Sequence, residues 1–186
     1  MPRDARHVLT EYLLLAAQGG DEAAFAQLHD LWSSDLRRFA AVKLGVGDGG
    51  DEVAQDAWIA IAKSLHQLDD PACFPRWALR VVERRCCDWL RRRRTAQTGF
   101  VPLTTEIVEN AAAPAPHDGD DDGTTRLRAA IASLDHEART LLHLFYEQGL
   151  SVAELAEVLD VPIGTAKSRL FTLRQTLRQS IERNSR

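Results

Sequence analysis

The sequence is poor in cysteine and has no long apolar run. Its three cysteines, Cys73, Cys86 and Cys87, are odd in number and two are adjacent, which fits neither a disulfide framework nor the CxxC spacing of a zinc site. We therefore expect reduced thiols. The apolar run at 8–17 is interrupted by Glu11 and has no clear small-residue cleavage site, which argues against a signal peptide. With no transmembrane stretch either, we expect a cytoplasmic protein without direct membrane insertion.

Patterns that carry enzyme chemistry are also missing. The six histidines have no metal-ligand spacing, no glycine-rich phosphate loop is present, and no nucleophile lies in a pattern that suggests a neighbouring base. The prediction is therefore a protein without catalytic residues, metal site or cofactor, and not an enzyme.

The composition favours helices. Hydrophobic residues make up 45% of the 186 residues, with alanine and leucine dominant and only two tyrosines, whereas sheets are richer in β-branched and aromatic residues. The length allows one medium domain or two small ones. We expect an all-α protein of two small helical domains.

The charge distribution points to nucleic acid although the formal net charge is −4. The segment 76–94 carries eight arginines against only Glu83 and Asp88, while 104–123 carries six acids and no lysine or arginine. Affinity for nucleic acid depends on cationic side chains that contact phosphates. A local basic patch therefore matters more than the net charge of the whole chain. This asymmetry favours a nucleic-acid partner over a membrane.

Helical periodicity organises the first half of the chain. Apolar residues recur in steps of three and four through 9–44, interrupted by Gly19 and Gly20, after which Asp21 is expected to cap a second helix. A glycine-rich turn follows at 45–50. Asp51 is then expected to cap a third helix that runs to about residue 68.

The next helix combines an apolar stripe with an arginine face. After an Asp-Asp-Pro turn at 69–71, apolar side chains recur at helical spacing from 74 to 90, and the opposite face carries Arg76, Arg80, Arg84 and Arg91. A nucleic-acid-binding helix needs this arrangement. The alternative is a helix surface that is simply solvated.

A loss of periodicity marks the domain boundary. From 95 to 125 the sequence is rich in alanine, proline, aspartate and glycine, as in a flexible acidic linker. The predicted division is a first domain at 1–94, a linker at 95–125 and a second domain at 126–186. Within the second domain, Gly149 is expected to end a leucine-rich helix.

The C-terminal part of the sequence has a helix-turn-helix pattern. Ser151 and Glu154 form a capping-box pattern, a turn follows at 160–162, and a second helix is expected with Ile163, Ala166 and Leu170 among its inward residues. Such a unit places its second helix in the major groove. An ordinary helical hairpin is the alternative for this segment taken alone.

Both halves resemble the extracytoplasmic-function sigma factors. The segment 151–170 (SVAELAEVLDVPIGTAKSRL) closely resembles region 4 of this family, and 134–150 (LDHEARTLLHLFYEQGL) looks like its lead-in helix. In the first half, 51–58 (DEVAQDAW) resembles the acidic helix of region 2, and 74–80 (FPRWALR) through 88–94 (DWLRRRR) resembles its promoter-melting helix. The two halves match in the right order across nearly the whole chain.

This resemblance implies a sigma factor that binds core RNA polymerase and promoter DNA, with an anti-sigma factor as a common further partner in the family. The residues expected to bind polymerase are Asp51, Glu52, Gln55, Asp56 and Trp58. Those expected at the downstream (−10) element are Arg76, Trp77, Arg80, Arg84, Arg85, Asp88 and Arg91. Those expected at the upstream (−35) element are Thr165, Lys167, Ser168, Arg169, Phe171 and Arg174. The linker would thread through the polymerase.

Two positions depart from the family pattern. Many members carry asparagine where this chain has Arg84, and arginine where it has Thr172. Because an arginine can stack on or bond an unpaired base, we expect a different base preference at the downstream element, the alternative being contact with phosphate only. The rival to a sigma factor is a regulator that binds its operator without polymerase and senses a ligand through its first domain.

Overall fold

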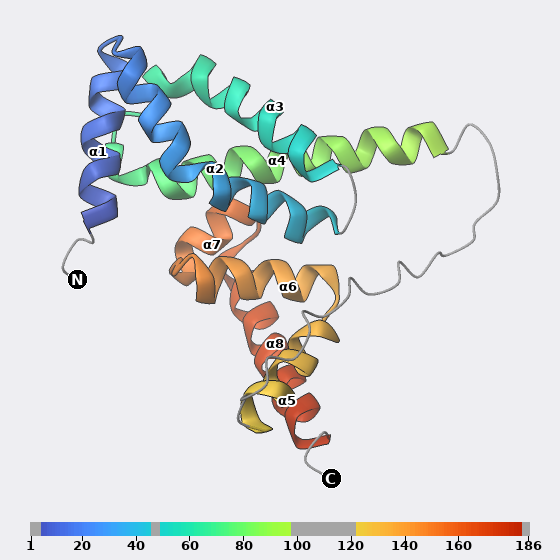
Figure 1. Ribbon diagram of the computed structural model, residues 1–186. Coiled ribbons are helices and arrows are strands. Elements are labelled where there is room, and N and C mark those ends of the chain that lie inside the picture. Colours follow the sequence, from blue (N-terminus) through green and yellow to red (C-terminus); the bar gives the residue numbers. More distant parts are fainter. Residues whose placement is uncertain (1–4, 46–48, 98–121, 184–186) are drawn as a thin grey trace.

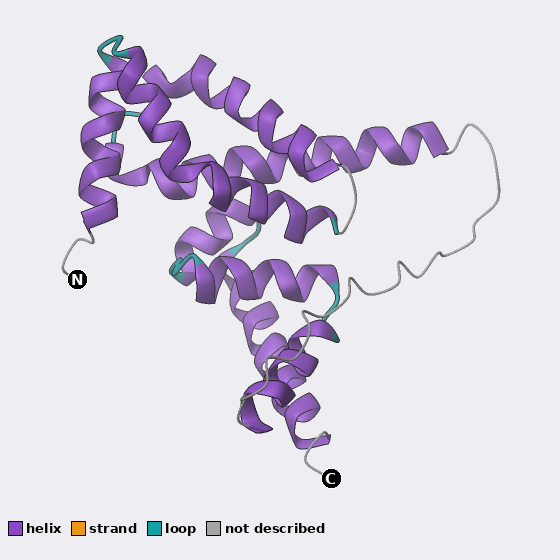
Figure 2. Ribbon diagram, in the orientation of Figure 1, coloured by secondary structure: helices purple, strands orange, loops and turns teal. Residues whose placement is uncertain are grey.

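The computed structural model describes residues 5–45, 49–97 and 122–183. Within these ranges the chain forms helices and their connections and no strand (Figure 2). The predicted all-α fold is confirmed. No helix among these residues is both long enough and apolar enough to span a lipid bilayer.

Four helices make up the first half of the chain. They are α1 (Ala5–Gln18), α2 (Glu22–Leu44), α3 (Gly49–Ser64) and α4 (Phe74–Gln97), with single turns η1 (Leu65–Gln67) and η2 (Pro71–Cys73) between the last two. The predicted break between the first two helices is confirmed, because the Asp21 carboxylate accepts a hydrogen bond from the Ala24 amide and caps α2.

The third helix differs from the prediction at both ends. It begins at Gly49, so Asp51 lies in its first turn and is not its cap. Packing is close at this start, since a Cβ atom at Gly49 would lie 2.6 Å from the Trp89 ring. The helix ends at Ser64 and not near residue 68. In the turn that follows, the carbonyls of Leu65 and Leu68 accept hydrogen bonds from the Gln18 side-chain amide, which joins this turn to α1.

The second half contains four more helices and a π-helical turn. These are α5 (Asp122–Ala132), α6 (His136–Leu142), the turn η3 (His143–Glu147), α7 (Val152–Leu159) and α8 (Ile163–Arg183). Gly149 has a φ of 67° after η3, as expected of a residue that ends a helix. Most of the predicted linker, 98–121, lies outside the described residues, and its two ends belong to α4 and α5.

The helix-turn-helix prediction is confirmed by α7 and α8. Ser151 and Glu154 cap α7 reciprocally, and Asp160 turns the chain with a left-handed φ of 54°. Ala166 and Leu170 are buried as expected. The expectation for Ile163 is wrong, because this first residue of α8 sits beside the turn and remains half exposed.

The two halves share one continuous apolar core. In Figure 1, α1 to α4 lie together, and α6 and α7 pass beneath α2 and α4 with α5 and α8 below them. The buried cluster runs from Leu14 and Phe39 to Leu155 and Leu170, and the Phe39 ring stacks on His143 across the boundary. We call this boundary, where α2 meets α6 and α4 meets α7, the seam.

Gly45 lies beside the start of α6. It ends α2 with a φ of 83°, a conformation that suits glycine. A Cβ atom at this position would lie 2.6 Å from the His136 ring at the start of α6. A side chain at this position would therefore require the exposed His136 ring to move.

A buried ion pair joins α2 to α4. The Lys43 ammonium lies 2.7 Å from the Glu83 carboxylate, whose side chain is only 8% exposed. The second carboxylate oxygen of Glu83 has no hydrogen-bond partner within the described chain. Replacing Lys43 with methionine would leave this charge uncompensated, and a charge left in this way costs about 3–5 kcal/mol.

We therefore expect Lys43→Met to lower the free energy of unfolding in urea by about 3 kcal/mol or more. The double variant Lys43→Met/Glu83→Leu should recover most of the loss because it removes both charges. The matched control is Arg37→Met, which breaks the exposed pair with Asp51 and should cost less than about 1 kcal/mol. Equal losses for Lys43→Met and Arg37→Met would contradict this assignment.

Candidate nucleic-acid interface

The acidic surface of α3 faces solvent but is tied to its neighbours. Asp51 pairs with Arg37 of α2 at 3.0 Å, and Asp56 lies 3.8 Å from Arg92 of α4. The Glu52 carboxylate accepts a hydrogen bond from the Trp89 indole at 3.2 Å, while Gln55 is exposed between these residues. The structure therefore brings the acids of the predicted polymerase site together along one helix.

Trp58, the fifth member of that predicted site, has a different environment. Its side chain is buried, meets Phe25 edge to face at a centroid distance of 6.1 Å, and lies 4.7 Å from the His29 ring. A hollow of about 500 Å³ lies beside it between α2 and α3, lined in part by Gln55 and Ile59. Trp58 thus supports the α3 surface from below, while the exposed apolar group there is Ile59.

The arginine face of α4 is divided by the seam. Arg84, Arg91 and the following arginines are exposed to solvent. Arg76 and Arg80, nearer the start of the helix, are about two-thirds covered and lie against α7. The predicted arginine face is therefore present, but only its second half is accessible in this arrangement.

The other residues of α4 around the arginine face are less exposed than Arg84. Trp77 and Trp89 are half-buried and pack against the core. Arg85 is half-buried, and Asp88 pairs with Arg91 at 3.1 Å on the same helix. Arg84 is the exposed arginine of α4 next to the seam.

All three cysteines are free thiols. Cys86 is fully buried, and desolvation raises the pKa of its thiol to about 12. Cys87 is exposed. Partial burial, together with the nearby Glu83 carboxylate, still raises the pKa of its thiol. The thiolate is the reactive form of cysteine. The raised pKa values of Cys86 and Cys87 therefore disfavour oxidation of either thiol.

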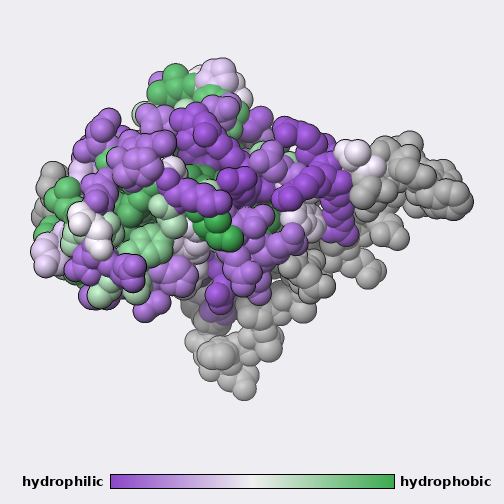
Figure 3. All heavy atoms as spheres, turned by 90° about the horizontal axis from the view of Figure 1, so that it is seen from above, coloured by the Kyte–Doolittle hydropathy of each residue, from purple (hydrophilic) through white to green (hydrophobic). Residues whose placement is uncertain are grey.

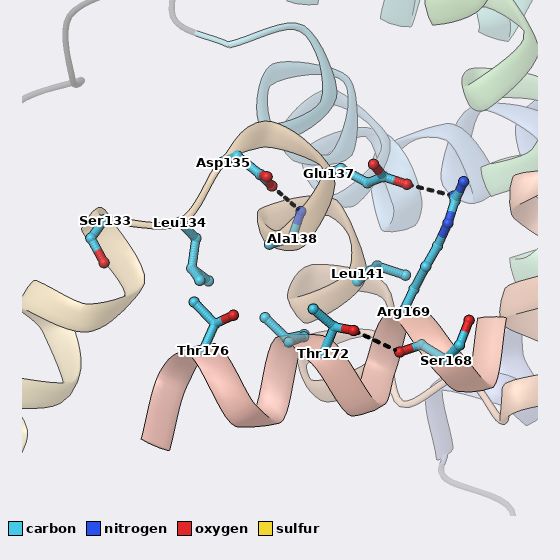
Figure 4. A pocket seen from close by; sticks show the side chains of 11 residues that line it. Ser133, Leu134, Asp135, Glu137, Ala138, Leu141, Ser168, Arg169, Thr172 and Thr176 are labelled. Carbon is cyan, nitrogen blue, oxygen red and sulfur yellow. Dashed lines mark hydrogen bonds and ion pairs between the residues drawn. The ribbon is translucent and has the colours of Figure 1, made fainter. Parts of the chain in front are cut away.

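The recognition helix α8 presents its predicted DNA-binding residues on two sides. Lys167, Phe171 and Arg174 follow one another in steps of four and three, and all three are exposed. Ser168 and Arg169, together with Thr172, instead line a hollow of about 380 Å³ beside α6 (Figure 4). Thr165, the remaining member of the predicted set, is half-buried at the start of the helix.

Two arginines of α8 are held by neighbouring elements. The Arg169 guanidinium forms an ion pair with Glu137 of α6 at 2.6 Å, which Figure 4 shows at the edge of the hollow. The Arg174 guanidinium donates to the Tyr146 hydroxyl at 3.1 Å and lies over the Phe145 ring. Both side chains are therefore oriented before any DNA is bound.

Sequence reasoning missed the acids of α7. Glu154, Glu157 and Asp160 recur in steps of three, and this spacing was a visible signal for one acidic face. What that face would meet depends on tertiary packing, and the structure shows that it meets the arginines of α4. Burial alone would raise the pKa of the Glu154 carboxyl, but hydrogen bonds from Ser151 and the charge of Arg76 hold that pKa below its usual value.

The face of the molecule seen from above is mostly hydrophilic (Figure 3). The view from above shows polar residues over most of the described face, with hydrophobic residues gathering toward the end where α1 lies (Figure 3). Val8, Tyr12 and Leu15 are exposed on α1. Among the described residues, no group of three or more histidine, cysteine or acidic side chains is arranged to hold a metal ion.

The sequence is similar to sigma factors over almost its full length. The family model described as ECF sigma factor matches residues 8–183. SigM of Mycobacterium tuberculosis, an ECF RNA polymerase sigma factor, is 30% identical over 173 residues, covering 92% of this chain and 85% of SigM. SigW of Bacillus subtilis is 25% identical over 170 residues, covering 87% of this chain and 91% of SigW.

Solved structures share the fold. CnrH in complex with the cytosolic domain of CnrY matches with a TM-score of 0.61 at 22% identity, over 94% of this chain and 97% of CnrH. The sigma factor RpoE of Bartonella quintana, in complex with the anti-sigma factor NepR, matches with a TM-score of 0.64 at 21% identity, over 85% of this chain and 96% of RpoE. With the family model matched from the first helix to the last, the chain belongs to the ECF family of RNA polymerase sigma factors and directs transcription initiation at promoters.

Proposed function

We propose that the chain divides promoter recognition between its halves. Core RNA polymerase docks on the α3 surface of Asp51, Glu52, Gln55 and Asp56, supported by Trp58. The arginine face of α4 binds the downstream element during strand opening, and α8 reads the upstream element. The chain itself catalyses no reaction and works in the cytoplasm.

One observation carries this proposal: a single chain bears two separate cationic helix faces, on α4 and α8, and an acidic helix, α3. Phosphates attract both cationic faces, and α8 follows the turn of a helix-turn-helix, where base edges in the major groove can be reached. The acids of α3 would meet a basic partner surface instead of DNA. This third surface is what a stand-alone DNA-binding regulator does not need.

An anti-sigma factor is the further partner that we propose. Of the two solved relatives above, one is bound to the anti-sigma factor NepR and the other to the cytosolic domain of CnrY. The exposed apolar residues of α1 and the exposed Ile59 of α3 offer surface for such a protein. Co-purification from the native cell would identify it.

Run-off transcription tests the function directly. Core polymerase alone should give no specific transcript from a candidate promoter, and addition of this chain should produce one that depends on both promoter elements. The rival reading, a regulator that acts without polymerase, predicts a footprint on the same DNA by the chain alone. A footprint without polymerase, together with no specific transcript in its presence, would contradict the proposal.

A further inference from the structure

Tyr146 is paired with Arg174 of the recognition helix. Tyr146 belongs to the π-helical turn η3 and is 53% exposed. Its hydroxyl oxygen accepts a hydrogen bond from the Arg174 Nε atom at 3.1 Å, across 28 positions of the chain. Arg174 in turn lies on the exposed face of α8 that Lys167 and Phe171 share. The contact therefore places a side chain from outside the helix-turn-helix beside the predicted DNA-binding face.

The turn η3 brings two neighbouring aromatic side chains to Arg174. Phe145 and Tyr146 meet edge to face at a centroid distance of 4.9 Å, and the Arg174 guanidinium lies 5.5 Å from the centre of the Phe145 ring. His143 and Leu144, which precede them, are buried and anchor the turn in the core. Turns of π-helical geometry are rare and are frequent at functional sites. Two contacts from one anchored turn thus hold the Arg174 side chain.

The pair keeps hydrogen-bond donors available for an external acceptor. Arg174 uses its Nε atom for the bond to Tyr146, so its two terminal NH2 groups remain available. The Tyr146 hydroxyl accepts that bond and still has its own proton to donate. Within the described residues, neither side chain has a further hydrogen-bond or ion-pair partner. Both groups are therefore able to bind an acceptor that lies outside the chain.

A backbone phosphate of DNA suits this pair better than a base edge. In a helix-turn-helix, residues near the start of the second helix contact the bases, whereas Arg174 lies in the middle of α8. Arginine and tyrosine side chains are common ligands of the DNA backbone. The two non-bridging oxygens of one phosphate can accept from the guanidinium and the hydroxyl at the same time.

We propose that Tyr146 and Arg174 together bind one backbone phosphate of the upstream element, so that the DNA-binding surface extends from α8 onto the turn η3. This site rests on the proposed role of α8 at the upstream element. Because the two side chains are already held together, binding of a phosphate requires little further ordering of either one.

The test measures binding of holoenzyme to promoter duplexes by fluorescence anisotropy. Tyr146→Phe removes only the hydroxyl and keeps the ring against Phe145, and we expect it to weaken binding about 3–10-fold. Arg174→Ala should weaken binding about 10-fold or more. Because a phosphate carries no base identity, both losses should be equal on matched and single-mismatch upstream elements.

Duplexes with one neutral methylphosphonate in the upstream backbone locate the phosphate. At one position the unmodified chain should lose affinity, while Tyr146→Phe and Arg174→Ala should both lose much less there, because their contact to that phosphate is already missing. The double variant Tyr146→Phe/Arg174→Ala should lose less than the sum of the two single losses. This shared position is a readout that a merely structural role of Tyr146 would not give.

The matched control is Thr176→Val. It removes a hydroxyl from an exposed position on the side of α8 that faces the hollow in Figure 4, and it should leave binding close to that of the unmodified chain. Unchanged binding by Tyr146→Phe would overturn the proposal. So would an equal loss in the control, or loss of methylphosphonate sensitivity at different positions in the two variants.

Run-off transcription with holoenzyme reports separately on the function. At saturating holoenzyme, Tyr146→Phe should still give the promoter-specific transcript, since one lost contact is offset by concentration. If the unmodified chain directs specific transcription but Tyr146→Phe binds normally, the proposed function stands and only the shared phosphate site is lost. If the unmodified chain directs no specific transcript, the proposed function itself fails.

Discussion

Reversal of charge on α3 is expected to abolish capture of core RNA polymerase. Glu52→Lys/Asp56→Lys would place two cations where a basic partner helix is expected, and loss of contacts at the centre of an interface costs about 2 kcal/mol or more, a roughly 30-fold weakening. Pull-down of core polymerase by tagged protein measures the effect. Glu22→Lys/Asp30→Lys on α2 applies the same charge change away from α3 and should leave capture unchanged.

The two acids also hold α3 against α4. Glu52 and Asp56 contact Trp89 and Arg92 of α4, so their reversal also disturbs the packing of α3 against α4. Gln55→Lys avoids this, because Gln55 is exposed in the middle of the same surface. It should weaken capture about 10-fold or more while the protein melts normally, since a charge opposed to a like charge in an interface is costly. Normal capture by both variants would refute docking through α3.

The second large effect is expected on α8. If Arg169 reads a base edge, Arg169→Ala should weaken binding to a matched upstream element by about 1–3 kcal/mol, a roughly 5- to 150-fold loss, and should lose discrimination at one base pair. Lys167→Ala should weaken binding evenly across sequences and reduce its salt dependence. Anisotropy titrations of holoenzyme on matched and single-mismatch duplexes at several salt concentrations separate the two roles.

The ion pair of Arg169 offers a matched control. Glu137→Gln releases the Arg169 guanidinium while leaving it in place, so binding to the matched element should stay equal or become tighter. Arg178→Ala removes an arginine further along the same helix and should cause only a small, even loss. If Arg169→Ala reduces binding equally on every sequence, Arg169 contacts phosphate only and another residue of α8 reads the element.

The features that could be predicted from sequence are those set by local interactions. The cap at Asp21 and the capping box of Ser151 and Glu154 involve residues three positions apart, and the turn at Asp160 follows from its neighbours. Helical periodicity likewise indicated which side of α4 would be apolar. Each of these depends on side chains within one or two turns, where spacing alone determines which groups meet.

The features that could not be predicted depend on distant partners. Trp58 has helical spacing with the α3 acids, yet its indole is buried because Phe25 and His29 of α2 lie against it. At the start of α3, Gly49 lies against the Trp89 ring, forty residues away in the chain. The seam itself unites side chains on either side of residues 98–121, and no local pattern indicated that α7 would lie against α4.

Because the apolar core continues across the seam, temperature and salt are expected to affect the contact between the two halves in different ways. Separating the halves would hydrate apolar groups such as Phe39, and hydration of apolar surface raises the heat capacity. The apolar part of the seam therefore weakens on cooling, while the carboxylate–guanidinium pairs weaken as ionic strength rises. Low temperature would thus weaken the seam through its apolar contacts. High ionic strength would weaken the same seam through its ion pairs.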